Sequence, residues 1–409
     1  MQAYTALTLP NGAVIPNRLA KAAMEENMAD NDHAPSKELI RLYQSWADGG
    51  VGLMITGNVM IDRRAMTGPG GVVLDSGQFG ARFEQWSKTA RSQGAQIWMQ
   101  INHPGRQMPA AMGQETMAPS AVSMDLGNFS KQFSAPRQMT EADIADVKER
   151  FVNTARLAEQ FGFTGVQIHA AHGYLLSQFL SPLTNRRSDR WGGSLENRAR
   201  LLVDVVQSVR QAVGKGFAVA VKLNSADFQK GGFSPDEARQ VVAMLNPMGV
   251  DLIELSGGSY EAPAMHGQAR DGRTLAREAY FLEFAKDIAK VAHMPIMVTG
   301  GIRRYPVVEQ VLGSGIAMAG MGTALAIDPQ LPKAWLADRS ASPLLRAITW
   351  KNKVLSSIAY MAMVKYQLRR LSQGKHTRPN VAPALALLIQ QLETKVRNWQ
   401  YRRMMRSGL

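Results

Sequence analysis

Short runs of apolar residues recur along this chain and alternate with longer stretches whose apolar residues repeat every three or four positions. The runs are typical of strands buried on both faces of a parallel sheet, and the stretches between them are typical of amphipathic helices. Eight such strands separated by helices predict an α/β fold of the (β/α)₈, or TIM-barrel, type. The predicted strands are Leu19–Met24, Val51–Thr56, Ala95–Gln100, Gly165–His169, Phe217–Leu223, Asp251–Ser256, Pro295–Thr299 and Ile316–Gly320.

Three segments interrupt or extend this alternation. Residues 1–17 contain a Pro-Asn-Gly turn signal at positions 10–12, which predicts a small hairpin closing the bottom of the barrel. Residues 103–139 are rich in Met, Pro, Ser and Gly, and we interpret them as a capping insertion after the third strand. We expect one domain over residues 1–330, the barrel, and a helical C-terminal extension over residues 331–409.

The charge of the chain is concentrated in the extension. The whole chain carries a net charge of +14, but residues 339–409 alone hold 14 Lys and Arg against one acid, Glu393. The remaining 33 basic and 32 acidic residues nearly cancel. The net positive charge is therefore a property of the extension, and it does not indicate a nucleic-acid partner for the barrel.

The extension has helical composition over residues 343–372 and 383–406. Three interpretations stay open for it. The simplest is packing on the barrel or at the subunit interface of a homo-oligomer. The second is a basic amphipathic surface for peripheral contact with anionic lipid, and the third is contact with an acidic partner or nucleic acid.

Composition excludes several kinds of chemistry. The chain has no cysteine, so disulfides, thiolate catalysis and a 4Fe–4S site are excluded. The N-terminus lacks the pattern of a signal peptide, and no run of about eighteen apolar residues occurs. We therefore expect a cytoplasmic protein.

The most informative stretch is Gly165–Arg198. A predicted buried strand is followed within six residues by His169, His172 and Tyr174. In a (β/α)₈ barrel, catalytic groups lie where a strand ends and its loop begins. These three side chains could also be ordinary polar groups at a strand end. A metal site is disfavoured, because no third ligand of a suitable type stands nearby.

The loop after these residues carries a longer pattern, which resembles that of the Old Yellow Enzyme family of flavin-dependent ene-reductases. The resemblance runs from about Leu7 to Pro329. It implies bound FMN, NADH or NADPH as the reductant, and an enone-type small molecule whose activated C=C bond is reduced. The matching residues are Ser181, Pro182, Asn185, Arg187, Asp189, Trp191, Gly192, Gly193, Ser194, Glu196, Asn197 and Arg198.

The resemblance assigns catalytic roles to the three residues after the fourth strand. His169 and His172 would donate to the substrate carbonyl oxygen as negative charge develops there. Tyr174 would give the proton that the α-carbon needs. No GxGxxG fingerprint occurs, so the nicotinamide would be a visiting substrate without a Rossmann domain of its own.

The resemblance also implies a set of flavin-contacting residues at the ends of other strands. Gln100 offers an amide to the flavin pyrimidine edge, and Lys222 places a cation beside flavin N1 and O2. A Schiff-base role for Lys222 would leave the Gly165–Arg198 pattern unexplained. The full set is Ala22, Ala23, Met24, Glu25, Gly57, Gln100, Lys222, and the phosphate-loop residues Gly300, Gly301, Gly322 and Thr323.

Two positions depart from the family pattern. Thr323 stands where relatives usually have Arg, and Arg303 is a candidate replacement for that lost positive charge. Glu25 stands where relatives often have Cys or Thr near flavin C4. A carboxylate there would disfavour the anionic reduced flavin unless it is protonated or turned away.

Two functions therefore compete. The first is an FMN-dependent NAD(P)H oxidoreductase that reduces α,β-unsaturated carbonyl compounds. The second is a non-catalytic barrel protein that acts through its basic extension as a membrane- or partner-binding module.

Overall fold

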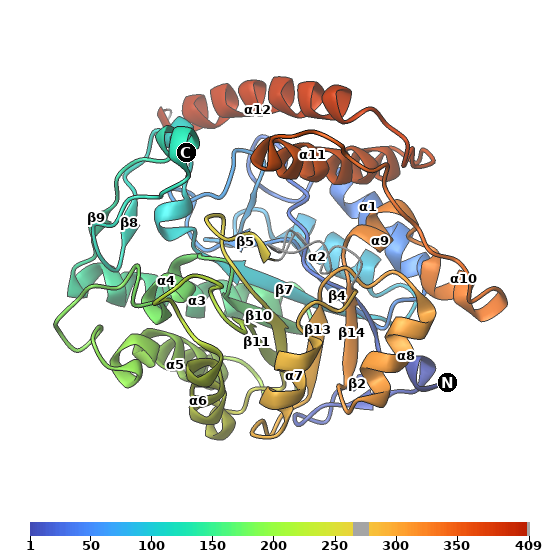
Figure 1. Cartoon of the computed structure of the whole chain (residues 1–409), viewed down its shortest axis with the longest axis horizontal. Helices are drawn as coiled ribbons and strands as arrows, with labels where there is room; N and C mark the ends of the chain where they lie inside the picture. Colours follow the sequence, from blue (N-terminus) through green and yellow to red (C-terminus); the bar gives the residue numbers. More distant parts are fainter. Residues whose placement is uncertain (265–277, 407–409) are drawn as a thin grey trace.

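The computed structural model describes residues 1–264 and 278–406, and its centre is a closed barrel of eight parallel strands (Figure 1). The strands pair in chain order, and β10 pairs with both β7 and β11, so the described strands close into a ring. All eight predicted strands are confirmed, with ends shifted by up to three residues. They are β3 (Leu19–Lys21), β4 (Leu53–Ile55), β7 (Gln96–Asn102), β10 (Gly165–Ala170), β11 (Ala218–Asn224), β12 (Leu252–Ser256), β13 (Ile296–Thr299) and β14 (Met318–Met321).

The lower part of the barrel interior is an apolar plug. Trp98 and the inward side chains of β4, β12 and β14 form one buried cluster. The predicted N-terminal hairpin, β1 (Leu7–Thr8) paired with β2 (Val14–Ile15), adds Leu7 and Ile15 to that cluster. The hairpin therefore seals one end of the barrel, and ligand chemistry is left to the other end.

Helices cover the outside of the barrel, and capping residues stand at the start of several of them. Thr140 caps α3 and Ser234 caps α6, each in a capping box with the acidic residue three positions on. The covering helices are α1 (Lys37–Gly49), α2 (Gly80–Ala90), α3 (Glu141–Gln160), α4 (Leu175–Leu180), α5 (Leu195–Ala212), α6 (Pro235–Leu245), α7 (Leu282–Ala289), α8 (Tyr305–Gly313), α9 (Thr323–Ile327) and α10 (Leu331–Ala337).

The capping insertion contains short elements that the sequence did not indicate. Three 3₁₀ turns (Gly105–Gln107, Ala110–Met112 and Gly127–Gln132) lie within it, and β8 (Met117–Ala118) pairs in parallel with β9 (Arg137–Gln138). Before it, β5 (Val59–Met60) pairs with the end of β7 and carries β6 (Val72–Val73) at its edge. These pairs are only two residues long, too short to leave a periodic sequence pattern.

The C-terminal extension folds into two long helices, α11 (Lys353–Ser372) and α12 (Pro383–Arg406), which lie in two layers over the barrel with α12 outermost (Figure 1). The predicted helix at 343 begins ten residues later, because the side chain of Asn352 caps the backbone N–H of Leu355. Among the described residues, no helix combines the length and apolar character that a membrane span requires.

The extension packs on the barrel through specific contacts. Val364 and Leu368 of α11 belong to the main hydrophobic core, and Tyr401 of α12 lies in a separate buried cluster with Met60 and Met66. Arg397 donates to the carbonyl oxygen of Ala29, and the hydroxyl of Tyr401 donates to that of Arg63 at 2.7 Å. Because these partners follow barrel strands, the extension covers the end of the barrel where the strands finish.

Candidate active site

A polar layer lies directly above the apolar plug. Side chains alternate along a strand, so the inward positions after the plug are Gln100, Gln167, Lys222, Glu254 and Thr299. Glu254 is the centre of the layer, because it accepts hydrogen bonds from Lys222 at 2.8 Å, from Thr299 at 2.7 Å and from Gln167 at 2.7 Å. Gln100 donates in turn to Gln167 at 2.7 Å. Gln100 and Lys222 therefore reach the same interior surface, as predicted, but Lys222 is paired with a buried carboxylate.

The opposite wall of the barrel mouth is built from small residues. Ala22 follows β3 directly, Gly57 lies two residues after β4, and Gly320 lies in β14. A Cβ atom at Gly57 would overlap the Glu26 carboxylate, and one at Gly320 would overlap the Thr299 hydroxyl. A floor that is polar on one side and without side chains on the other suits a flat ring with one polar edge.

His169 and Tyr174 lie beside each other at the end of β10. Their ring centroids are 4.9 Å apart, and the rings of His169 and His172 are 5.1 Å apart. Burial, and secondarily Lys222, holds the pKa of His169 well below its ordinary value, so the ring is neutral at pH 7. The backbone N–H of Ala171 donates to its Nδ1 at 3.2 Å, which places the proton on Nε2. His169 is thus a neutral donor.

His172 is held by the loop that follows β10. Its backbone has φ of +61°, a left-handed conformation that is uncommon outside glycine. Its N–H donates to Asn224 at 3.0 Å, and its Nε2 lies 2.7 Å from the hydroxyl of Ser256. The ring is therefore oriented from β11 and β12 as well as from its own loop.

Tyr174 is paired with a second tyrosine. The hydroxyl oxygens of Tyr174 and Tyr260 are 2.9 Å apart. Burial, Tyr260 and Glu25 raise the pKa of Tyr174 well above its ordinary value, so it keeps its proton at neutral pH. Burial and Glu25 likewise raise the pKa of Tyr260. The sequence did not reveal Tyr260, because it lies 86 residues from its partner and belongs to no motif.

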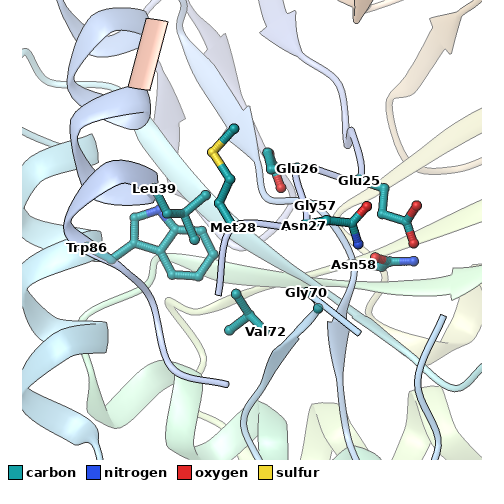
Figure 2. A pocket seen from close by; sticks show the side chains of 11 residues that line it. Glu25, Glu26, Asn27, Met28, Leu39, Gly57, Asn58, Gly70, Val72 and Trp86 are labelled. Atoms are coloured by element: carbon teal, nitrogen blue, oxygen red, sulfur yellow. The ribbon is translucent and has the colours of Figure 1, made fainter. Parts of the chain in front are cut away.

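Glu25 lies at the mouth of the barrel with a cationic partner. Its Oε2 accepts from Lys365 of α11 at 3.0 Å, and the Lys365 ammonium also donates to Asn27. Figure 2 shows Glu25, Asn27 and Asn58 lining one pocket with Gly57. Burial raises the pKa of Glu25, but the positive charge of Lys365 and the polar groups of Thr67 and Asn27 oppose burial and hold that pKa below its ordinary value. The carboxylate is thus ionised and paired, neither protonated nor alone.

The two glycine loops meet near the first turn of α9. Gly300 and Gly301 have φ of +155° and +69°, and a Cβ at Gly301 would overlap the Tyr280 hydroxyl. Thr323, the first residue of α9, hydrogen-bonds Tyr360 of α11, a contact that offsets part of the rise that burial causes in the pKa of Tyr360.

Arg303 stands at these loops, as the sequence suggested, but it is paired. Its guanidinium lies 3.2 Å from Glu278, while its Nε is buried without a hydrogen-bond partner among the described residues. Both amide atoms of Asn102, at the end of β7, are buried and lack a partner there too. These donors, with the glycine loops and the small-residue wall, fit a phosphorylated flavin. In the described part of the chain, no cluster of three or more His, Cys, Asp or Glu could hold a metal ion.

The model of the NADH:flavin oxidoreductase / NADH oxidase family matches residues 4–340. This chain belongs to that family. The family model implies FMN as the cofactor, and the names of relatives support a nicotinamide reductant. The resemblance to the Old Yellow Enzyme family is therefore confirmed.

Two fungal relatives carry the same printed name, NADH-dependent flavin oxidoreductase iliE. The protein of Hypocrea jecorina is 37% identical over 355 residues, which are 81% of this chain and 88% of that protein. The protein of Neonectria sp. is 38% identical over 352 residues, 80% of this chain but only 46% of that protein. The chain thus spans less than half of the Neonectria relative.

Solved structures of similar proteins share the fold. An Old Yellow Enzyme homologue from Zymomonas mobilis superposes with a TM-score of 0.72 and 24% identity, over 84% of this chain and 94% of that one. A 2-naphthoyl-CoA reductase complex superposes with a TM-score of 0.75 and 27% identity, over 83% of this chain and 52% of that one. The closed barrel of eight parallel strands therefore has the architecture of these reductases.

Proposed function

We propose that this chain is an FMN-dependent NAD(P)H oxidoreductase that reduces the activated C=C bond of α,β-unsaturated carbonyl compounds. The observation that supports this most is the convergence of His169, His172 and Tyr174 over the polar layer of the barrel, with Tyr174 protonated and hydrogen-bonded to Tyr260. When bound, FMN would accept hydride from the nicotinamide and deliver it from N5 to the β-carbon of the substrate.

The two histidines would bind and polarise the substrate carbonyl. His169 offers an Nε2–H, and His172 is oriented by Asn224 and Ser256. Donors fixed in a buried site stabilise an oxygen that gains negative charge as hydride arrives, because they need no rearrangement during the reaction.

Tyr174 would supply the proton. Hydride adds to the β-carbon and the Tyr174 hydroxyl proton adds to the α-carbon, so the C=C bond becomes a single bond while the nicotinamide is oxidised. Tyr260 lies 2.9 Å from Tyr174 and can return a proton to it from the solvent side.

Comparing two tyrosine variants in separate half-reactions tests the assignment. Tyr174→Phe should leave flavin reduction by NAD(P)H nearly intact and slow enone reduction on the order of a hundredfold, because the proton is missing when hydride transfers. Tyr260→Phe should slow enone reduction less, because Tyr174 keeps its own proton. Equal slowing of both half-reactions by Tyr174→Phe would make it a residue that only orders the pocket. Unchanged enone reduction would assign the proton to another donor.

The second hypothesis, a non-catalytic barrel acting through its extension, has weaker support. The chain belongs to an oxidoreductase family, and helix α11 of the extension packs into the main hydrophobic core. Peripheral membrane contact, self-association and a cytoplasmic location stay predictions.

A further inference from the structure

Lys365 is a buried cation that the C-terminal extension carries to the barrel mouth. Only 9% of its surface is exposed, although lysine is rarely buried without a partner. Its partners are Glu25 and Asn27, which follow β3 and lie 340 and 338 residues away along the chain. The ammonium therefore joins the last part of the sequence to the first strand of the barrel.

Helix α11 places this ammonium firmly. On one side of Lys365, Val364 and Leu368 pack into the main core; on the other, Ala362 and Met363 form a separate buried cluster with residues of α12. One turn further toward the helix start, Tyr360 lies against Thr323 at the glycine loops. Because α11 is packed on both sides of Lys365, the side chain of Lys365 is held in a fixed position at the barrel mouth.

Glu25 lines the same pocket as Asn58, and both residues act on Tyr174 (Figure 2). The charge of Glu25 acts on the hydroxyls of both Tyr174 and Tyr260. Around Glu25 stand Lys365 from α11, Thr67 from the loop after β5, Asn27 from its own loop, and the two tyrosines. Lys365 supplies the positive charge beside Glu25, while the neighbouring Glu26 has its own partner in Lys21.

We propose that Lys365 is a positioning residue of the active site, which fixes Glu25 and balances its charge beside the Tyr174–Tyr260 pair. The C-terminal extension then completes the proton-donating side of the site. This inference rests on the proposed function, because it assigns Lys365 an effect on the step in which Tyr174 gives up its proton.

The effect of losing Lys365 follows from the charges. Without it, Glu25 is a carboxylate in a mostly buried place, and burial raises its pKa. At a pH above that raised pKa, the unbalanced negative charge opposes both proton loss from Tyr174 and negative charge on the substrate. At a lower pH Glu25 is neutral, so it no longer opposes proton loss from Tyr174 or negative charge on the substrate.

The first test is the pH profile of enone reduction in the flavin-loaded full chain. Lys365→Met should slow this half-reaction on the order of tenfold at alkaline pH and much less at acidic pH. Lys365→Arg, which keeps the charge, should stay within a few-fold of the wild type. Glu25→Gln/Lys365→Met should lose the new pH dependence. Lys375→Met, an exposed lysine of the same extension, is the matched control and should behave as wild type.

Thermal unfolding provides a readout that does not need activity. In the wild type the lowered pKa of Glu25 means that the pair stabilises the fold above the ordinary carboxyl pKa, and that this stabilisation is lost as pH falls through the lowered value. In Lys365→Met the contribution of Glu25 to stability has the opposite sign, because the unpaired carboxylate destabilises the fold once it ionises. The unfolding temperature of Lys365→Met should therefore fall increasingly below that of the double variant as pH rises from about 5 to about 8.

Several outcomes would overturn the proposal. They are a wild-type pH profile for Lys365→Met, a double variant no better than the single one, or a constant gap in unfolding temperature. If Lys365→Met does not fold, the double variant decides: its folding would support charge balance, and its failure would leave Lys365 a packing role only. A wild type that reduces no enone would instead refute the proposed function, while the unfolding comparison would still test the ion pair.

Discussion

At the scale of single residues, the structure adds a buried ion-pair partner to the interpretation of Lys222. The resemblance places Lys222 near the end of a strand as a cation beside the flavin, and in the structure it lies two residues before the end of β11 and is paired with Glu254, both almost fully buried. The pair and its amide partners make the floor of the site electrically balanced. Removing the charge of either residue should therefore change both the potential of the bound flavin and the free energy of unfolding.

Lys222→Met should lower the potential of the bound flavin and slow its reduction by NAD(P)H. Removing the cation takes away a charge that stabilises the reduced ring, and it leaves Glu254 as an unpaired negative charge beneath it. The variant should also lose about 3–5 kcal/mol of unfolding free energy, the usual cost of breaking a buried pair. Spectroelectrochemical titration and denaturant unfolding check the two effects.

Lys222→Arg is the control for that experiment, because it keeps the charge and should retain most of the potential. An unchanged potential in Lys222→Met would assign Lys222 a structural role in the polar layer and none toward the flavin.

Glu25 shows where reasoning from the sequence stops. Its departure from the family pattern was visible, but its consequence was not, because the compensating Lys365 lies 340 residues away in a segment outside the resemblance. Tyr260 was not identified from the sequence for a related reason. Pairs that form only when the barrel closes leave no local signal in the chain.

At the scale of elements, the barrel itself was predictable from local patterns. Buried parallel strands leave apolar runs, and helix starts such as Thr140 and Ser234 carry capping residues that the structure uses. Packing of the extension on the barrel was the simplest interpretation of its sequence, but the residues through which α11 packs and the short pairs around β7 were not predictable, because they depend on partners distant in sequence. The predicted domain boundary at residue 330 stays a prediction.

Helix α12 retains one unpaired apolar face. Large side chains on it stay about half exposed, and basic residues flank them toward the helix end. The exposed apolar residues are Leu385, Leu388, Leu392, Val396 and Trp399. This arrangement keeps the lipid-surface interpretation open for α12, although α11 is used in packing.

If that interpretation holds, the protein should float with anionic liposomes at low salt and dissociate as salt rises, because the attraction is electrostatic. Replacing Leu388, Leu392 and Trp399 with Ser should abolish flotation while leaving the flavin content unchanged. Equal behaviour of that variant and the wild type, or flotation with neutral liposomes only, would contradict a lipid role for this face.

At the scale of the whole molecule, helix α11 of the extension and the barrel share one hydrophobic core. Helix α11 supplies core residues, the partner of Glu25 and a tyrosine at the glycine loops, and α12 packs against α11. Helix α11 is thereby part of the wall around Glu25.

The proposed reaction moves hydride to the β-carbon and a proton to the α-carbon of an enone. Analysis of the product formed without oxygen from a cyclic enone and 4-deuterated NADH or NADPH, repeated with the unlabelled nucleotide in D₂O, tests both transfers. We expect the saturated ketone with deuterium at the β-carbon in the first case and at the α-carbon in the second. Absence of saturated ketone, or nicotinamide deuterium at the α-carbon, would contradict the proposed reaction.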